Sequence, residues 1–418
     1  MHNGDKTRDK ANAEALRRLT ESDPVLEDVV PAIDVLPGMT SETILASGPP
    51  LAWSDYVGGQ REGIIGGALF EGLARNRDEA EKKLASGQIR VDTCHGYGAV
   101  GSLAGIYTAS MPVFVVRNAT FGNIGFCNFY EGTNPRRLNY GVYDEGVRER
   151  LNFVHGVVAP VVRDAVRNAG GIPLKRIMQR ALHMGDELHS RNTAASLLFA
   201  RELFAYFLTI SQSQRGQLEK AVQALTEDHY FFLRLSMAAA KCIADAAHGV
   251  EGSSVVSAMC LNCIEFGVRV SGLGNQWFTG AQATCEAKLF EGHTEDEITW
   301  MGGDSAIAET VGIGGFAQAA AFPLQAYQGG SAKAMVERNL RMYDITTGEH
   351  THFKIPYLHY RGTPTGIDIF KVVNTNIQPV IDMGIAGRDG GQIGAGIVKA
   401  PLACFERAAE AFKARYNA

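Results

Sequence analysis

The sequence predicts a mixed α/β protein (α+β) in which two α/β parts enclose an inserted all-helical domain. In residues 1–145, short apolar segments of strand type alternate with helical ones. Residues 146–249 show apolar positions at helical spacing only, and residues 250–418 return to the α/β pattern with many glycine-rich loops. Since 418 residues are enough for two or three domains, we expect domains over residues 1–145, 146–249 and 250–418.

The first part contains elements that are marked by the residues at their ends. A charged helix is expected over Asn76–Ser86, because Asn76 is a good N-cap and Gly87 suits the position after the last turn. The other elements predicted here are a helix over Ala11–Thr20 and strands over Ile89–Val91 and Met111–Val116.

The middle part is predicted to be helical, because its apolar residues recur every three or four positions. The expected helices are Val147–Arg167, Leu174–Leu182, Ala194–Ile210, Gln217–Leu225 and Tyr230–Ala247. Gly170, Gly171 and Gly249 stand where the C-terminal caps of such helices belong.

The last part combines strands with glycine-rich loops and ends in a helix. Strands are expected over Val255–Val256, Phe266–Val270, Ile369–Val373 and Pro379–Asp382, and the final helix over Pro401–Tyr416. The glycine-rich loops are residues 271–274, 302–303, 312–315, 329–330 and 384–396.

Composition excludes several classes of protein. The net charge is −5 with both signs interspersed, which argues against a nucleic-acid-binding protein. No apolar stretch approaches the roughly 20 residues that span a bilayer, and the charged N-terminus lacks the apolar core of a signal peptide, so we expect a cytoplasmic location. Of seven cysteines only Cys260 and Cys263 form a C-x-x-C pair, without the second pair typical of zinc sites. We expect reduced thiols, no metal and no cofactor.

The most polar segment of the chain lies between two predicted helices, at residues 183–192 (HMGDELHSRN). On one continuous helix His189 would point about 160° away from Glu187, which argues against a metal site. One interpretation is a helix-to-helix corner, in which Ser190 or Asn192 caps the next helix and Arg191 pairs with Asp186 or Glu187. The other is the wall of an active site that faces a small polar ligand.

Two glycine-rich segments in the last part are candidate ligand loops. In the first, Asp304 or Ser305 is expected to cap a short helix, and Gly303 and Gly314 allow backbone N–H groups to approach an anion. The second has six glycines in the 14 residues 383–396 and contains Arg388, Gln392 and Gly394. Plain turns are the alternative interpretation of both segments. No Walker A pattern occurs in the chain, which argues against an ATP-binding P-loop.

Cys94 and His95 follow a predicted strand and precede a G-x-G-x-x-G string. A dinucleotide site is not favoured, because the next acidic residue is Glu131, beyond the expected ribose position. An anion held by the loop is the better interpretation, with His95 as acid or base and Cys94 as nucleophile, or with both as buried structural residues. Arg269 and Ser271 form another polar pair at a strand end.

Seven segments, in order along the chain, occur together in one family. The sequence resembles the AllG (YlbE-like) family, a subunit of the oxamate carbamoyltransferase of anaerobic allantoin degradation. The segments that carry the resemblance are residues 48–53, 94–112, 184–192, 269–278, 303–307, 391–396 and 400–406.

The resemblance implies interconversion of oxalurate plus phosphate with oxamate plus carbamoyl phosphate. It also implies companion carbamoyltransferase subunits, one of them similar to an acyl-CoA synthetase. It assigns no catalytic residue to this chain, so the candidates come from the sequence itself. The catalytic candidates are His95, Asp186, Glu187, His189 and Asp304.

Carbamoyl transfer needs cations or N–H groups for the phosphate, a stabiliser for the carbonyl oxygen and an arginine for the acceptor carboxylate. The arginines inside the motif segments are Arg191, Arg269 and Arg388. The Ser-Thr-Arg-Thr and His-Pro-x-Gln loops of aspartate- and ornithine-type transcarbamoylases are absent, which predicts a different fold. The candidates for binding carbamoyl phosphate and an oxamate-like acceptor are Cys94, Arg191, Asn192, Arg269, Ser271, Gly303, Ser305, Gly314, Arg388, Gln392 and Gly394.

Two alternatives to a transferase stay open. The same residues suit an amide or ureide hydrolase, with water in place of phosphate and Cys94 or an Asp/His pair activating the attack. The chain can also be a non-catalytic scaffold subunit, with the chemistry in a partner chain. We expect companion subunits, a homo-oligomer or both.

Overall fold

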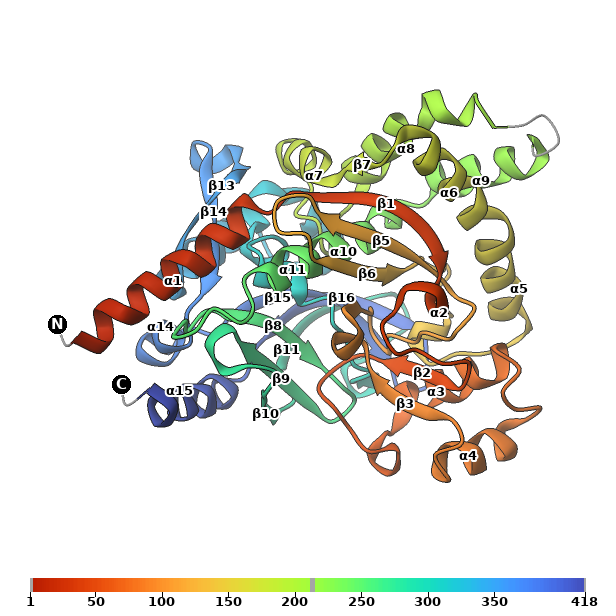
Figure 1. Cartoon of the computed structure of the whole chain (residues 1–418), viewed down its shortest axis with the longest axis horizontal. Helices are drawn as coiled ribbons and strands as arrows, with labels where there is room; N and C mark the ends of the chain where they lie inside the picture. Colours follow the sequence, from red (N-terminus) through yellow and green to blue (C-terminus); the bar gives the residue numbers. More distant parts are fainter. Residues whose placement is uncertain (1–2, 211–214, 417–418) are drawn as a thin grey trace.

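A computed structural model describes residues 3–210 and 215–416, and it has the predicted mixed α/β class. Its largest sheet has the strand order β4-β6-β5-β1-β7 (Figure 1). The strands are β1 (Pro24–Pro31), β4 (Ala99–Val100), β5 (Pro112–Asn118), β6 (Ile124–Asn128) and β7 (Ile172–Pro173). Strand β5 lies in the middle, and its apolar residues are buried on both faces.

The predicted helices of the middle part are all present, although they begin and end a few residues from the expected positions. They are α5 (Glu145–Phe153), α6 (Ala159–Ala169), α7 (Leu174–His183), α8 (Thr193–Phe207), α9 (Arg215–Glu227) and α10 (Phe231–Ala246), with a π-helical turn at Val154–Val158 between α5 and α6. Gly170 adopts φ 70° directly after α6, as a C-terminal cap requires.

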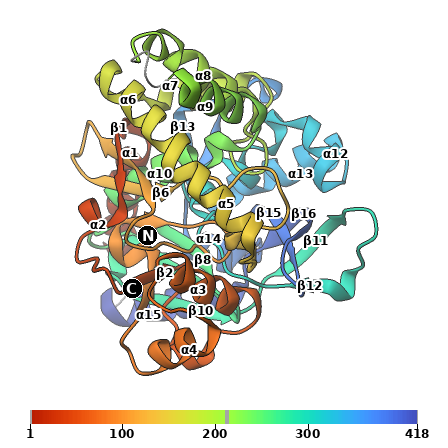
Figure 2. The same cartoon turned by 90° about the vertical axis from the view of Figure 1, so that its right-hand side faces the viewer.

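These helices do not have a core of their own. The largest apolar cluster joins Leu26 of β1 and Phe114 of β5 to Val162 of α6, Phe199 of α8 and Phe232 of α10. Helix α10 packs against β5 and β6, and α6 to α9 lie along one side of the molecule (Figures 1 and 2). The inserted all-helical domain is therefore not confirmed, and the boundaries at residues 145 and 249 stay a prediction.

A smaller layer carries the segment that contains Cys94 and His95. It is built from the short α2 (Ala32–Val35), the parallel strands β2 (Thr43–Ala46) and β3 (Arg90–Thr93), and the helices α3 (Gly58–Phe70) and α4 (Arg77–Ala85). The N-terminal helix α1 (Asn3–Glu21) lies apart from this layer and packs against β13, β14 and α10. As predicted, the Asn76 side chain caps α4 by accepting the N–H of Glu79, and Gly87 has φ 74°.

The last part has two further sheets, a hairpin and five helices among its described residues. The sheets are β10-β9-β8 and β11-β16-β15-β12. The strands are β8 (Val256–Leu261), β9 (Glu265–Val270), β10 (Trp277–Ala281), β11 (Thr284–Leu289), β12 (Ile298–Thr299), β13 (Thr346–Ile355), β14 (Arg361–Ile367), β15 (Val380–Gly387) and β16 (Gln392–Lys399). The helices are α11 (Ile307–Thr310), α12 (Gln325–Gln328), α13 (Ala332–Met342), α14 (Ile369–Thr375) and α15 (Leu402–Tyr416).

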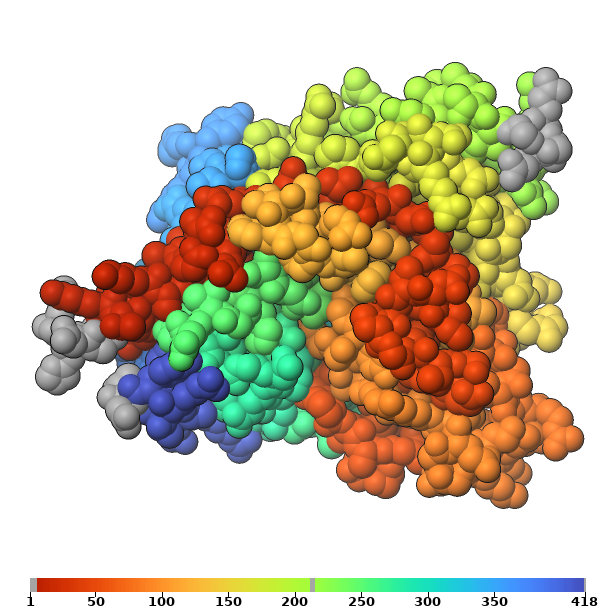
Figure 3. Space-filling model, in the orientation of Figure 1, coloured from red at the N-terminus to blue at the C-terminus, as the bar shows by residue number. Residues whose placement is uncertain are grey.

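Helix α15, at the C-terminal end, covers β9 and β10, and it lies beside residues 250–290 on the face shown in Figure 3. No described helix combines the length and the apolar character needed to cross a membrane.

Two predictions in the last part are wrong. Ile369–Val373 was expected to be a strand because it is rich in Val and Ile, but it lies in helix α14. Asp368 decides this, since its carboxylate accepts the N–H groups of Phe370 (2.8 Å) and Lys371 (3.2 Å). The glycine-rich residues 384–396 are not an extended loop, because most of them form the β15–β16 hairpin.

Candidate functional site

A polar pocket opens where all three parts of the chain meet. Its volume is about 40 Å³, which is space for about three water molecules or a small organic anion. The first part contributes Ser102, Leu103, Tyr130, Glu131, Arg137, Asn139 and Tyr140; the middle part His189, Ser190, Tyr230, Leu233 and Arg234; the last part Ser305, Tyr327, Gly384 and Gln392.

Two buried arginines give the pocket its charge. Arg137 and Arg234 are 3% and 2% exposed. Arg234 donates from Nη1 to Oδ1 of Asn128 (2.8 Å), and Arg137 donates from Nη2 to Oε1 of Gln392 (2.6 Å). Among the described residues neither guanidinium forms an ion pair with a carboxylate, and the Nε atom of each is buried without a hydrogen-bond partner. The pocket lining holds two arginines and one carboxylate, that of Glu131, so its excess positive charge favours an anion.

Tyrosine rings and one carboxylate fix the position of Arg137. Its guanidinium lies 5.0 Å from the ring centre of Tyr130 and 4.5 Å from that of Tyr140. The Glu131 carboxylate lines the pocket but accepts the N–H groups of Leu138 (2.7 Å) and Asn139 (3.0 Å). It therefore shapes the turn that presents Arg137, and it favours the positive charge of the guanidinium without forming an ion pair with it.

His189 is the titratable base of the pocket. Its Nδ1 lies 2.8 Å from Oε1 of Glu309, while Nε2 makes no hydrogen bond to a described residue. Burial opposes a positive charge on His189, but the Glu309 carboxylate outweighs burial and raises the pKa of the imidazole. Oε1 of Glu309 also accepts the N–H groups of Gly315 (2.8 Å) and Asp382 (3.2 Å), so it holds the imidazole at a fixed orientation.

The remaining polar residues of the 183–192 segment form the corner between α7 and α8. Glu187 accepts the N–H groups of Ser190 (2.5 Å) and Arg191 (3.0 Å). Asp186 accepts the N–H of Ala195 (2.8 Å) in the first turn of α8 and lies 3.5 Å from Nε of Arg191. The predicted capping by Ser190 or Asn192 is wrong, because α8 has no side-chain cap at Asn192, whose amide donates to the carbonyl of His189 (2.8 Å).

Behind the pocket lies a second buried polar cluster, around His95. Nδ1 of His95 is 3.2 Å from Nζ of Lys241, which is paired with Asp245 (2.7 Å). Asp245 also accepts from Nη2 of Arg269 (2.7 Å). Burial lowers the pKa values of His95 and Lys241.

Asp304 joins this cluster to the loops around it. Its carboxylate accepts the N–H groups of Gly48 (2.8 Å) and Gly101 (2.9 Å), and burial raises its pKa to about 7. The prediction that Asp304 or Ser305 caps a helix is wrong, since α11 starts at Ile307 without a side-chain cap. Asp304 faces His95, while the next residue, Ser305, lines the pocket. One loop therefore contributes a residue to the pocket and a residue to the second cluster.

The structure places most of the residues singled out from the sequence in three groups: the pocket, the corner and the second cluster. His189, Ser305 and Gln392 line the pocket. Asp186, Glu187, Arg191, Asn192 and Gly314 build the corner that holds His189, with the Gly314 N–H donating to the Glu187 carbonyl (2.7 Å). Cys94, His95, Arg269, Gly303 and Asp304 lie in or beside the second cluster.

Three candidates belong to neither site. The Ser271 hydroxyl donates to the carbonyl of Ala247 (2.6 Å). Arg388 is exposed at the tip of the β15–β16 hairpin and donates to the carbonyl of Asp296. Gly394 lies in β16, where a Cβ atom would meet the carbonyl oxygen of Lys288 at 2.6 Å, so glycine is needed there for strand packing.

Cys94, beside the second cluster, does not suit the role of a nucleophile. It is fully buried, and burial raises the pKa of its thiol.

Sequence reasoning missed several buried charged residues of the pocket and of the second cluster. Arg234, Lys241 and Asp245 stand seven and four residues apart in the otherwise apolar helix α10, and this helical spacing is a signal that could have found them. Arg137 and Glu309 carry no comparable local pattern.

A family model and one relative of known assignment both point to the same family. Residues 89–305 match the family described as oxamate carbamoyltransferase subunit AllG. The chain is 37% identical over 407 residues to the oxamate carbamoyltransferase subunit AllG of Escherichia coli (strain K12), covering 96% of this chain and 97% of that protein. It is 42% identical over 409 residues to uncharacterized protein YahG of the same strain, covering 97% and 86%. A crystal structure of a conserved protein of unknown function from Enterococcus faecalis V583 has a TM-score of 0.96 and 39% identity, covering 99% of each chain.

Proposed function

Because this chain belongs to the AllG family of oxamate carbamoyltransferase subunits, we propose that it is a subunit of such an enzyme and binds small anionic substrates between Arg137 and Arg234. The single observation that carries this proposal is the pair of buried arginines without a carboxylate partner in the described chain. An anionic substrate supplies the missing charge, and it displaces only a few water molecules from a pocket of about 40 Å³.

The lining of the pocket suits an oxamate-like acceptor and carbamoyl phosphate. An arginine fork binds a carboxylate or a phosphate through two parallel N–H···O bonds. Ser190, Ser305 and Gln392 also line the pocket and carry neutral hydrogen-bonding groups. Together, the arginines and these neutral groups can distinguish the carboxylate end of a small amide carboxylate from its amide end. This recognition needs no nucleotide-binding feature.

His189 is the residue that we assign to proton transfer. In the transfer, the amide nitrogen of oxamate forms a bond to the carbamoyl carbon, the bond from that carbon to the phosphate oxygen breaks, and oxalurate and phosphate result. The nitrogen loses one proton, which His189 accepts and passes to the leaving phosphate. The arginines stabilise the negative charge that develops on the leaving group.

The proposal includes companion subunits and a cytoplasmic location. The names of the family and of its Escherichia coli relative both contain the word subunit, which supports a multi-chain enzyme. In such an enzyme, partner chains can complete the catalytic site. The pocket of this chain binds the substrates in either case.

Calorimetric titration of the purified chain with oxamate, and separately with carbamoyl phosphate, tests the proposal. We expect binding of at least one of them, with affinity reduced on the order of 10-fold or more in Arg234→Gln. Arg388→Gln is the matched control, because Arg388 is exposed on the β15–β16 hairpin. No binding by the chain, or equal losses in both variants, contradicts the assignment of the pocket.

A phosphate-dependence assay then separates the transferase from a hydrolase. With its companion chains present, the enzyme should cleave oxalurate only when phosphate is supplied. Equal cleavage without phosphate identifies an amide or ureide hydrolase and contradicts the transferase.

A further inference from the structure

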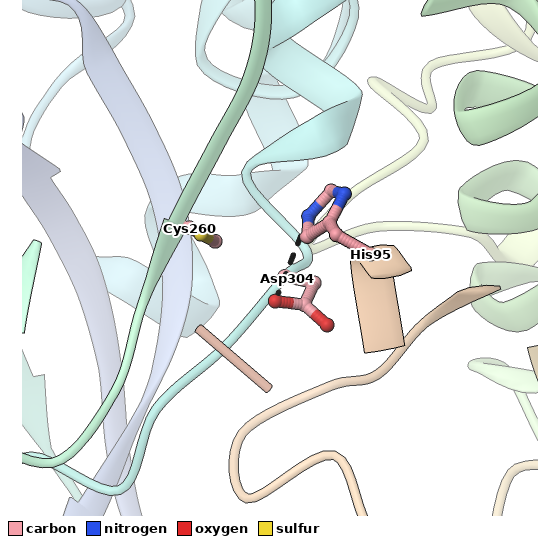
Figure 4. A group of neighbouring side chains, drawn as sticks. All are labelled: His95, Cys260 and Asp304. Atoms are coloured by element: carbon pink, nitrogen blue, oxygen red, sulfur yellow. Dashed lines mark ion pairs between the residues drawn. The ribbon is translucent and has the colours of Figure 1, made fainter. Parts of the chain in front are cut away.

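Three buried side chains outside the pocket bring metal-binding atoms together (Figure 4). They are His95, in the 3₁₀ turn after β3, Cys260, in β8, and Asp304, in the loop before α11. One nitrogen, one sulfur and one carboxylate oxygen from them all lie within 4.8 Å of one another. His95 is 5% exposed and the other two are fully buried, so the surface does not supply competing water.

Two of these atoms lack a partner in the described chain. Nε2 of His95 is buried without a hydrogen bond and lies 3.7 Å from Oδ1 of Asp304, beyond hydrogen-bonding distance. The Cys260 thiol is free, and none of the hydrogen bonds between described residues involves its sulfur. Buried polar atoms are normally satisfied, and a cation between the three side chains can satisfy these two atoms together with the Asp304 carboxylate.

We propose that His95, Cys260 and Asp304 bind one divalent transition-metal ion of the zinc class. Imidazole nitrogen, thiolate sulfur and carboxylate oxygen are the three ligand types that zinc takes in proteins, and cobalt(II) substitutes for it. Two light ligand atoms of a tetrahedral zinc ion are about 3.4 Å apart, so the 3.7 Å between His95 and Asp304 needs little closure. A tetrahedral ion has a fourth position, which this set leaves to water or another small ligand.

The surroundings orient two of the three ligands, Asp304 and His95. The N–H groups of Gly48 and Gly101 hold the Asp304 carboxylate, and the Trp277 ring meets the His95 ring edge-on at 5.1 Å. Nζ of Lys241 contacts Nδ1, the ring nitrogen that does not ligate.

Cys263 distinguishes this site from a C-x-x-C site. The sequence pairs it with Cys260, but in the structure it is not part of the ligand group. Its sulfur accepts the N–H of Val57 (3.4 Å) and packs in the apolar cluster around Ile64 and Ala80. Cys263→Ser is therefore a matched control for Cys260→Ser.

The test uses the full chain after removal of bound metal with a chelator, titrated with cobalt(II) alone. We expect one equivalent to bind with an absorption band from thiolate-to-cobalt charge transfer, and zinc(II) to displace it. Cys260→Ser should lose the band and weaken binding more than roughly 100-fold, because even outer-shell changes weaken metal sites 10- to 100-fold. Cys263→Ser should retain both.

Several results would overturn the proposal. They are the absence of cobalt binding by the wild-type chain, a bound cobalt ion without the thiolate band, and equal losses in the two serine variants. If Cys260→Ser does not fold, the wild-type spectrum alone decides whether a cysteine ligates. None of these readouts involves oxamate or carbamoyl phosphate, so the metal site and the proposed function fail or stand separately.

Discussion

Nδ1 of His189 lies 2.8 Å from Oε1 of Glu309, and this contact ties the corner between α7 and α8 to the short helix α11. The two residues are 120 positions apart, and both are buried. Gly314 makes the close approach possible, because its backbone passes directly beside the Glu309 carboxylate. The pocket, the corner and the glycine-rich loop thus depend on one another.

Glu309→Gln tests the role of this contact in turnover. Glu309 raises the pKa of His189, so its neutralisation should lower that pKa and move the acid limb of the kcat/KM profile to lower pH. The maximal rate should fall on the order of 10-fold or more, because the glutamine no longer stabilises the imidazolium. The measurement is the pH dependence of kcat/KM with the companion chains present. An unchanged limb would falsify the assignment of His189 as the base.

The same pair predicts a pH dependence of stability. The folded pKa of His189 is raised above its unfolded value, so its contribution is fully present below the unfolded pKa and is lost as pH rises through the folded pKa. Denaturant unfolding at a series of pH values should show this loss in the wild type. In Glu309→Gln the loss should be smaller, whereas an equally steep loss excludes His189 as its source.

Gly314→Ala should damage both stability and activity. Gly314 has φ +63°, and a Cβ atom there would lie 2.0 Å from Oε1 of Glu309 and 3.0 Å from Cβ of His189. Gly292→Ala is the control, since Gly292 has φ +88° but nothing within 4 Å of its Cβ position. Gly292→Ala should show only the backbone strain of about 1 kcal/mol. Thermal unfolding and turnover should both be more affected at Gly314, and equal effects would show that the Glu309 contact is unimportant.

Asp186→Ala should destabilise the fold by about 1 to 2 kcal/mol, since it removes the carboxylate that accepts the Ala195 N–H at the start of α8. Asn192→Ala is the comparison, because Asn192 stands at the N-cap position without a capping bond. Urea unfolding measures both. The capping role of Asp186 is wrong if the two variants lose equal stability, and oxamate affinity should change little in Asp186→Ala.

Asp228, beside the pocket, should make stability fall as pH rises. Burial raises its pKa to about 6, against the N–H bond from Tyr230, which lowers it. The folded state therefore holds its proton more tightly than the unfolded state, and stability decreases between about pH 4 and pH 6 by about 2 to 3 kcal/mol. Asp228→Asn should flatten this part of the curve. Asp389→Asn, on the exposed hairpin tip, should leave it unchanged.

Arg137→Lys tests whether the guanidinium shape matters in addition to its charge. Lysine keeps the charge but loses the fork that reaches Gln392 and the flat contact with Tyr140. We expect oxamate affinity to fall about 10-fold by calorimetry. Arg191→Lys, at the corner, should bind normally, and a loss at Arg191 with none at Arg137 would move the anion site to the corner.

Local patterns in the sequence were sufficient where neighbouring residues decide the structure. The cap at Asn76 and the glycine at Gly87 fix the ends of α4, and regular apolar spacing predicts the helices from α5 to α10. Ile369–Val373 shows the limit of such patterns, because one hydrogen-bonding side chain, Asp368, outweighs the strand preference of its β-branched residues.

The sequence by itself determined the mixed α/β class, the run of helices and, through its motif segments, the family. It also brought attention to His189, Ser305 and Gln392, which line the pocket. Only the tertiary structure decided that Arg137 and Arg234 share this pocket without an ion-pair partner among the described residues, and that His95, Cys260 and Asp304 converge. The reason is physical: helix periods and caps act within a few residues, whereas these groups meet through packing of segments that are between 44 and 209 positions apart.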